Sequence, residues 1–378
     1  MHISDKVNLL AEAAKFDLCG SFLCSPQAVQ RKPTLNGWIY PTILPNGKTV
    51  RLLKILFSND CIHNCYYCAN RRDRSFRRIS FTADELLRLF LELKRKNLVD
   101  GLFLSSAVTR SPKYTMEQML KVAEVLREKY AFRGYIHLKI FSESSPDYIE
   151  AAIKYADRVS VNLESPQEKY LREIAPEKDF SQLLNKFEIL KNLSQKNLRP
   201  KAGITTQFVV GASKEKDIEI LSLVSKLYRE YELSRAYFSA FQPIPFTPLE
   251  EKSPTSTWRE IRLYEADFLI RKYNFSLNEF IFDEKGNLPL EEDPKLLWAK
   301  QNLELFPIEI NKADYNQLIR IPGIGPISAK KILELRKTQK IKDINDLKKL
   351  GIQVERCKNF ILINGRSPSS LEKQLTLF

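Results

Sequence analysis

The sequence has few cysteines, no long apolar run and no internal repeat beyond an alternation described below. Six cysteines in 378 residues are too sparse for a disulfide framework, which favours a reducing compartment, the cytoplasm. No window approaches about 18 uninterrupted apolar residues, so no membrane span is expected. Residues 1–17 carry scattered acids and lack the apolar h-region of a secretory signal. They predict a short amphipathic helix instead.

The composition is typical of a globular protein, with 43% hydrophobic and 28% charged residues. The length suffices for one large core and a small second domain. The net charge is +14, and residues 307–378 hold 14 Lys and Arg against 7 Asp and Glu. Half of the positive excess therefore lies in less than a fifth of the chain. This asymmetry suits a polyanionic partner, and the alternative is a lysine-rich solvated surface.

Six short runs of β-branched or apolar residues alternate with longer helical patterns in the middle of the chain. Strand and helix alternation of this kind predicts parallel strands with right-handed crossovers. Six units make a partial barrel or an open α/β sheet, with the site at the carboxyl ends of the strands. The runs are residues 51–58, 101–107, 134–141, 158–164, 203–211 and 235–241.

Three helix starts carry recognisable signals. Thr82 with Glu85, and Thr115 with Gln118, each fit a capping box. Ser145 followed by Pro146 fits an N-cap with proline at the first helical position.

The segment "CIHNCYYC" places Cys61, Cys65 and Cys68 directly after the first of these strands. A structural zinc site wants a fourth Cys or His, usually in a second pair, and no second C-x-x-C follows. His63 lies between two of the cysteines and is poorly placed to close a tetrahedron with them. Three thiolates on an iron–sulfur cluster, which usually has four, leave one iron with an open position for chemistry.

The C-x-x-x-C-x-x-C spacing, with Tyr67 before the last cysteine and six βα units behind it, resembles the radical S-adenosylmethionine (AdoMet) superfamily. The resemblance spans about residues 51–245. It implies a partial (βα)6 barrel, a [4Fe–4S] cluster on the three cysteines, and AdoMet on the fourth iron. It also implies reductive cleavage of AdoMet to a 5′-deoxyadenosyl radical, with electrons from a donor such as flavodoxin or ferredoxin.

The resemblance further implies AdoMet contacts at the strand ends, where strand-end capping and coverage of the cluster are the alternative roles. "SSA" stands where the superfamily commonly has Gly-Gly-Glu, so Ser hydroxyls or backbone carbonyls replace the acid. "VNLE" resembles the ribose-contacting motif, "FVVGA" the adenine-packing segment, and "FSAFQPIPFTPLE" a strand that runs into a proline-rich loop. The implied contact residues are Tyr67, Ser105, Ser106, Asn162, Glu164 and Gly211.

The run "RRDRSFRR" follows the cysteines and contains five arginines. Beside an active site, such a run suits phosphate contacts along a nucleic-acid backbone, with Phe76 able to stack on a base. The alternative is a solvated loop anchored by a buried Phe. The candidate DNA contacts are Arg71, Arg72, Arg74, Arg77 and Arg78. Cys19, Cys24 and Cys357 make a poor second ligand set, and we expect buried or lightly functional thiols.

Near the C-terminus, a helix over 312–320 is expected to meet the hairpin "IPGIGP", with a second helix from Ile327. Backbone amides at such a turn, at the N-terminus of a helix, bind a phosphate oxygen without base discrimination. Residues 306–365 resemble the helix-hairpin-helix module of DNA repair and uptake proteins. Its implied DNA contacts are Gly323, Ile324, Gly325, Lys330 and Lys331. A hairpin used only for protein contact is the alternative.

The chain ends in "QLTLF", which resembles the pentapeptide by which bacterial replication and repair proteins bind the DNA sliding clamp. The implied contacts are Gln374, Leu375, Leu377 and Phe378. The alternative is a tail that packs on its own protein.

Together these features resemble a bacterial family of radical AdoMet proteins assigned to DNA modification or repair. The leading hypothesis is a radical enzyme acting on DNA and recruited to the clamp. The alternatives are a radical tRNA- or RNA-modifying enzyme and a non-catalytic, clamp-tethered iron–sulfur protein that binds DNA. The predicted organisation is an N-terminal segment 1–50, a radical AdoMet core 51–250, a helical connector 251–305, a helix-hairpin-helix domain 306–365 and a flexible tail 366–378.

Overall fold

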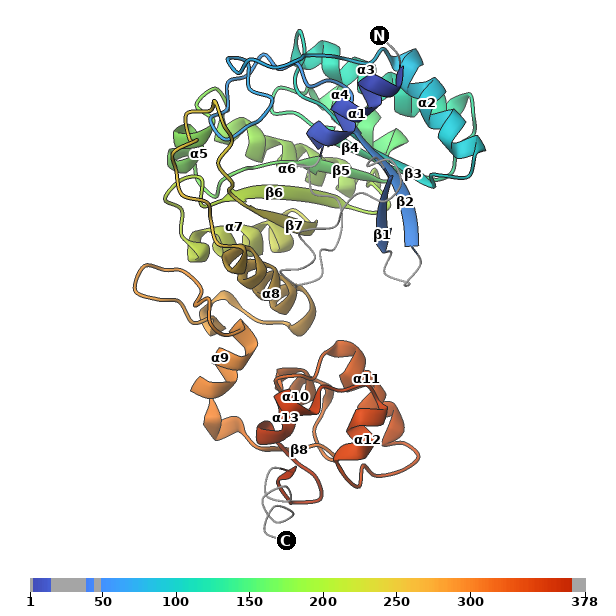
Figure 1. Ribbon diagram of the computed structural model, residues 1–378. Helices are drawn as coiled ribbons and strands as arrows, with labels where there is room; N and C mark the ends of the chain where they lie inside the picture. Colours follow the sequence, from blue (N-terminus) through green and yellow to red (C-terminus); the bar gives the residue numbers. More distant parts are fainter. Residues whose placement is uncertain (1–2, 15–38, 44–48, 369–378) are drawn as a thin grey trace. The chain divides into compact units, whose positions relative to one another are not determined.

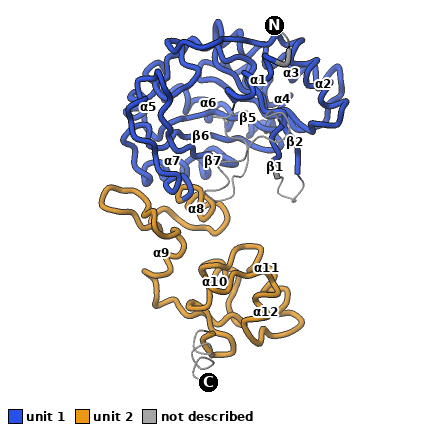
Figure 2. Tube along the Cα trace, viewed as in Figure 1, with its two compact units in different colours: residues 1–261 blue, residues 262–378 orange. Residues whose placement is uncertain are grey.

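The computed structural model describes residues 3–14, 39–43 and 49–368. The chain divides into two compact units, Met1–Ile261 and Arg262–Phe378 (Figure 2). The boundary falls inside helix α8 (Thr257–Tyr273), so the connector expected over residues 251–305 is shared between the two units. No helix in the described part of the chain is long and apolar enough to cross a membrane.

A curled seven-stranded sheet forms the first unit, with its strands in chain order (Figure 1). β1 pairs antiparallel with β2, and every later neighbour pairs parallel. Six parallel strands with intervening helices make the partial barrel, so the α/β fold class is confirmed. The strands are β1 (Ile39–Ile43), β2 (Thr49–Leu56), β3 (Gly101–Ser105), β4 (Tyr135–Ile140), β5 (Arg158–Val161), β6 (Ile204–Val210) and β7 (Leu233–Ala240).

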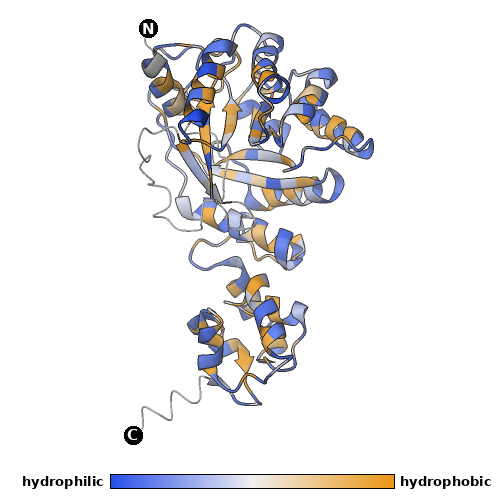
Figure 3. Ribbon diagram, turned by 90° about the vertical axis from the view of Figure 1, so that its right-hand side faces the viewer, coloured by the Kyte–Doolittle hydropathy of each residue, from blue (hydrophilic) through white to orange (hydrophobic). Residues whose placement is uncertain are grey.

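Helices cover the outer face of this sheet (Figure 1). α1, the amphipathic helix expected near the start, contacts β2. The strands carry hydrophobic and hydrophilic residues together (Figure 3), and most of their residues are buried, because the outer face packs under helices and the inner face lines a cavity. The helices of this unit are α1 (Ile3–Ala13), α2 (Ala83–Arg95), α3 (Pro112–Glu128), α4 (Pro146–Tyr155), α5 (Glu168–Ile174), α6 (Phe180–Gln195), α7 (Asp217–Glu230) and the first turn of α8.

Two of the three expected helix starts are confirmed. Thr82 and Glu85 form the reciprocal capping box at α2, and Ser145 precedes Pro146 at the start of α4. The prediction that Thr115 caps a helix is wrong. The N-cap of α3 is Ser111, and the helix begins at Pro112. The Thr115 hydroxyl lies in the first turns and donates to the carbonyl oxygen of Thr109 at 2.8 Å.

The second unit is mostly helical. Its first hairpin helix, expected from Lys312, begins at Tyr315, because Asp314 caps it and forms a capping box with Gln317. The expectation of an all-α domain is incomplete, since β8 (Ile308–Glu309) and β9 (Ile361–Leu362) pair in parallel. Cys357 is fully buried in its core. The helices are α9 (Pro294–Gln301), α10 (Tyr315–Arg320), α11 (Pro326–Leu335), α12 (Ile344–Lys349) and α13 (Val354–Cys357).

Candidate active site

A cavity opens at the carboxyl ends of the parallel strands, where the fold predicts the site. It encloses about 1300 Å³ of space, the open solvent at its mouth included. Inward-facing residues of successive strands form its wall, among them Leu56, Lys139, Asn162, Gln207 and Ser239. Four of these residues lie on β2, β4, β6 and β7, and Asn162 directly follows β5, so the cavity occupies the lumen of the partial barrel.

Cys61, Cys65 and Cys68 all line this cavity. Their loop is held in place by backbone bonds, since Ile62 N donates to Val108 O at 2.8 Å and Cys68 N donates to Cys65 O at 3.3 Å. Burial raises the pKa of Cys65 to about 11 and that of Cys68 to about 12. These thiols are therefore protonated in the cluster-free protein at neutral pH and bind iron with release of protons.

The three cysteines line one cavity, as the ligands of a multi-iron cluster would. Among the residues that the structure describes, no three His, Cys, Asp or Glu side chains could hold one ion together. His63 faces two carboxylates, with Nε2 3.4 Å from Glu143 and Nδ1 3.5 Å from Glu177. In a cubane cluster each thiolate binds a different iron atom, so the three sulfurs need not converge on one point.

A buried ion pair lies beside the cysteines. Glu164, which is 3% exposed, accepts a bond from Lys178 Nζ at 2.8 Å, and the Tyr67 hydroxyl also bonds to it. Burial lowers the pKa of Lys178, but Glu164 and the neighbouring cysteines outweigh this effect and raise it. Burial, and then the Glu164 charge, raise the pKa of Tyr67 well above its usual value.

The backbone of Glu164 is in the left-handed region, with φ +63°. Residues other than glycine adopt this conformation at a cost and are enriched at ligand-binding sites. Lys178 was missed by sequence analysis. It lies 14 residues after Glu164 in a loop, and no motif links the two positions.

Of the remaining candidates for AdoMet binding, two line the cavity and two do not. Asn162 and Ser106 line the cavity together with Tyr67 and Glu164. Ser105 is buried at the end of β3, one residue before the lining. Gly211 has φ +84°, and a Cβ there would lie 1.9 Å from Oγ1 of Thr255. The close approach that requires this glycine is thus to Thr255.

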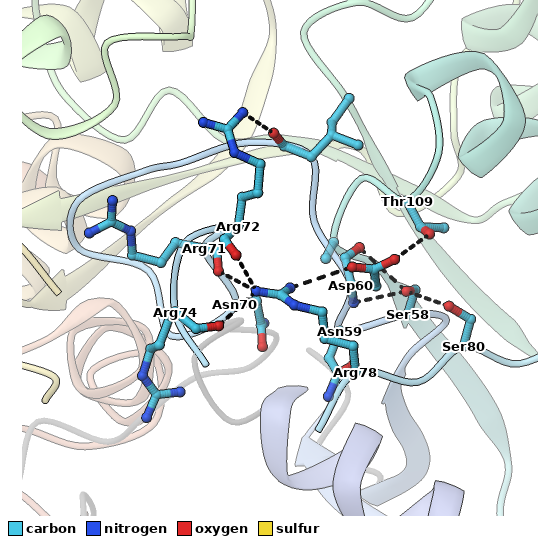
Figure 4. Close-up of polar contacts among 12 residues, drawn as sticks. Ser58, Asn59, Asp60, Asn70, Arg71, Arg72, Arg74, Arg78, Ser80 and Thr109 are labelled. Atoms are coloured by element: carbon cyan, nitrogen blue, oxygen red, sulfur yellow. Dashed lines mark hydrogen bonds and ion pairs between the residues drawn. The ribbon is translucent and has the colours of Figure 1, made fainter. Parts of the chain in front are cut away.

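Arg78 holds the loop that follows the cysteines (Figure 4). Its Nη2 donates to the carbonyl oxygens of Arg71 and Arg72 at 2.7 Å and of Arg74 at 2.9 Å. Its Nη1 lies 3.5 Å from Asp60. A guanidinium that bonds three backbone carbonyls stabilises the loop conformation.

The other four arginines of the run differ in exposure. Arg71 is buried, and its Nε donates to Asn64 Oδ1 at 2.7 Å. Arg74 is half-buried and donates to the Pro245 carbonyl at 3.0 Å. Arg72 and Arg77 are exposed. The run is therefore in part a structural element of the cluster loop.

The glycine hairpin precedes α11 in the second unit. Gly323 has φ +81°, and a Cβ there would lie 2.8 Å from the Cβ of Arg356. Ile324 is buried, and its carbonyl accepts a bond at 2.6 Å from Lys295 Nζ, itself buried. Gly325 is the N-cap of α11. The amides that open α11 have no intrahelical acceptor, which is the geometry that binds phosphate.

Two lysines on α11 add positive charge near this hairpin. Lys330 and Lys331 are both exposed. Lys331 Nζ donates to the Leu350 carbonyl at 2.9 Å, while Lys330 extends from the neighbouring position on the same helix.

Comparison with known protein families finds one match in each unit of the chain. Residues 55–227 match the radical SAM superfamily, and residues 307–361 match the helix-hairpin-helix motif. The chain thus contains a radical SAM domain, which makes it an enzyme of the class that uses a [4Fe–4S] cluster and AdoMet. A helix-hairpin-helix motif follows that domain in the same chain. The comparison with curated proteins found no match.

Solved structures of similar fold are distant in sequence. The FeFe-hydrogenase maturase HydG from Carboxydothermus hydrogenoformans is 15% identical over 57% of this chain, with a TM-score of 0.47. Methylornithine synthase PylB is 15% identical over 71% of this chain and 76% of its own, with a TM-score of 0.47. The methyltransferase TsrM from Kitasatospora setae is 11% identical over 52% of this chain and 35% of its own, with a TM-score of 0.40. The chain spans only 50% of the length of that HydG.

The residues of the cavity fit these cofactors. When bound, the cluster and AdoMet supply reductive cleavage of AdoMet to a hydrogen-abstracting radical. Cys61, Cys65 and Cys68 would hold the cluster, and Asn162 and Glu164 line the same cavity.

Proposed function

We propose that this radical SAM enzyme acts on DNA and modifies a base or repairs a lesion. One observation carries the proposal, namely the presence of a radical SAM domain at 55–227 and a helix-hairpin-helix motif at 307–361 in one chain. The first provides the chemistry. The second provides a grip on a nucleic-acid backbone that carries no base discrimination.

Charge supports the same partner. Residues 307–378 contain 14 Lys and Arg against 7 Asp and Glu. Positive groups near a phosphate-binding turn strengthen binding to a polyanion and make it dependent on salt. The sequence motifs, which resemble over nearly the whole chain those of the bacterial family assigned to DNA modification or repair, support the same proposal.

Recruitment to the sliding clamp belongs to this proposal. "QLTLF", with Gln374, Leu375, Leu377 and Phe378, lies outside the described residues. An extended tail can place its apolar residues in pockets of a partner while Gln374 hydrogen-bonds. Removal of residues 374–378 should abolish binding to purified clamp in a pull-down and leave DNA binding unchanged. Undiminished clamp binding would exclude the tail as the recruiting element.

The substrate base must leave the duplex to reach the cavity. The cysteines lie in the lumen of the barrel, and a base inside a stacked duplex cannot enter it. A flipped or already distorted nucleotide is therefore the expected substrate. An RNA substrate is the second candidate, since a phosphate grip does not distinguish DNA from RNA, and the clamp-like tail favours DNA. The non-catalytic alternative is disfavoured by the radical SAM domain.

The test measures AdoMet cleavage under anaerobic conditions. The protein is reconstituted with iron and sulfide and reduced, and 5′-deoxyadenosine is measured with duplex, single-stranded and UV-damaged DNA and with tRNA. Stimulation by a DNA form is expected. Stimulation by tRNA alone would move the function to RNA, and cleavage unaffected by either nucleic acid would refute the proposal.

A matched pair of charge reversals tests the grip. Lys330→Glu reverses a charge near the hairpin, and Lys340→Glu reverses an exposed charge beyond the other end of α11. DNA binding measured by fluorescence anisotropy should weaken severalfold more for Lys330→Glu than for Lys340→Glu. Equal losses would show that only net charge matters, and not the hairpin.

A further inference from the structure

Phe246 is an exposed aromatic residue in a loop that contributes residues to the wall of the cavity. Its side chain is 76% exposed. It lies two residues after Ile244, which lines the cavity, in the proline-rich loop between β7 and α8. Its backbone has φ +62°. The residue therefore combines a left-handed backbone with a large apolar side chain in solvent.

Both properties cost free energy in the free protein. Pro245 and Phe246 lie in a turn, and a turn with a left-handed third residue after proline favours glycine or asparagine there. An exposed phenyl ring gains nothing from burial. A glycine at position 246 would avoid both costs, so the phenyl ring must serve something other than the fold.

Hydrogen bonds within the loop and from Arg74 stabilise the turn that contains Phe246. The Phe246 amide donates to Glu250 Oε2 at 2.6 Å, and the Thr247 hydroxyl donates to the Ile244 carbonyl at 2.8 Å. From the cluster loop, Arg74 Nε donates to the Pro245 carbonyl at 3.0 Å. Three hydrogen bonds therefore stabilise the turn that exposes the Phe246 ring, and one of them comes from the loop that follows the cysteines.

Phe76, the residue expected from sequence to stack on a base, is placed differently. Two guanidinium groups lie near its ring, that of Arg74 at 5.3 Å and that of Arg78 at 4.5 Å, and the residue is only half-exposed. Cation–π contacts of this kind fix the ring within the loop. Of these two phenylalanines, Phe246 has the more exposed ring.

We propose that Phe246 is a wedge that enters the base stack of DNA and fills the gap left by the nucleotide that turns into the cavity. This inference rests on the proposed function and names the side chain that opens the duplex. Apolar wedges between base steps unstack DNA and kink it. The loop that carries this ring lines the cavity through Ile244, and Arg74, bonded to the Pro245 carbonyl, adds a positive charge to the turn.

The experiment compares duplex with single-stranded DNA. A wedge is needed only where a base must be unstacked, so Phe246→Ala should lower duplex-stimulated 5′-deoxyadenosine formation by about tenfold or more. Stimulation by single-stranded DNA should stay near that of the unaltered protein, and Phe246→Trp should restore duplex activity. Phe246→Gly should also lose duplex activity, with a melting temperature at least as high as that of the unaltered protein. Tyr130→Ala, which removes an exposed aromatic ring at the end of α3, should change neither activity.

The outcomes separate the two proposals. Equal loss with duplex and single-stranded DNA would show that Phe246 acts in binding or folding and would overturn the wedge. Full duplex activity in Phe246→Ala would overturn it as well. No stimulation of the unaltered protein by any DNA would overturn the proposed function itself, and the wedge with it.

Discussion

Removing the positive partner of the buried ion pair beside the cysteines should destabilise the first unit strongly. Lys178 and Glu164 are 2.8 Å apart, with side chains 17% and 4% exposed. Lys178→Met leaves a buried carboxylate without a counter-charge, which costs about 3–5 kcal/mol. This is a large share of the roughly 5–15 kcal/mol that stabilises a typical domain. The double variant Lys178→Met, Glu164→Gln removes both charges and should recover most of the loss.

Hydrogen exchange of the β5 amides in urea gives the free energy of opening for this unit. The control is Lys96→Met on α2, where Lys96 and Glu92 are 2.6 Å apart but more than half exposed. That exposed pair should contribute less than about 0.5 kcal/mol. If Lys178→Met costs no more than Lys96→Met, Glu164 is hydrated and the pair is not structural, which would refute the reasoning.

Three further predictions follow from the loops and the hairpin. Arg78→Met should lower the iron content of reconstituted protein severalfold because three loop carbonyls lose their donor. Arg88→Met, on an exposed position of α2, should not, and equal iron content would contradict the structural role. Burial lowers the pKa of Lys295 to about 7. Because the unfolded chain then binds more protons than the folded one above pH 7, stability of the second unit against urea should rise between pH 7 and about 10; a flat profile would contradict this. Gly323→Ala should lower the melting temperature of the second unit more than Gly365→Ala. Both have positive φ, but a Cβ at Gly365 meets nothing within 4 Å, and equal shifts would show that only backbone strain matters.

The parallel strands and the cluster loop could be predicted because their signals are local. Each strand is a short apolar run followed by a helix start, and the three cysteines lie within eight residues of one another. β1 was missed, because a five-residue strand that contains Pro41 gives a weak signal and is tolerated only at a sheet edge. The start at Thr115 failed because Ser111 and Pro112 provide a stronger N-cap four residues earlier.

Parts of the site depend on contacts that no spacing encodes. Glu164 and Lys178 lie on either side of α5 in the chain, so they meet only once that helix has formed. Arg78 was grouped with four other arginines by sequence, yet it bonds backbone carbonyls of its own loop. A run of like residues predicts net charge and not which member is exposed. Folding decides which arginine faces solvent.

The hairpin in the second unit depends on side chains outside its own motif. The motif covers residues 307–361, but Lys295 bonds the Ile324 carbonyl from α9. The Lys295 ammonium lies 4.6 Å from the ring of Tyr273 at the end of α8, and a Cβ on Gly325 would meet the hydroxyl of that tyrosine at 2.9 Å. The smallest fragment that could be exchanged between proteins with its phosphate-binding turn intact therefore begins before Tyr273. Recombination at the edge of the motif would transfer the sequence of the hairpin without the two residues that support it.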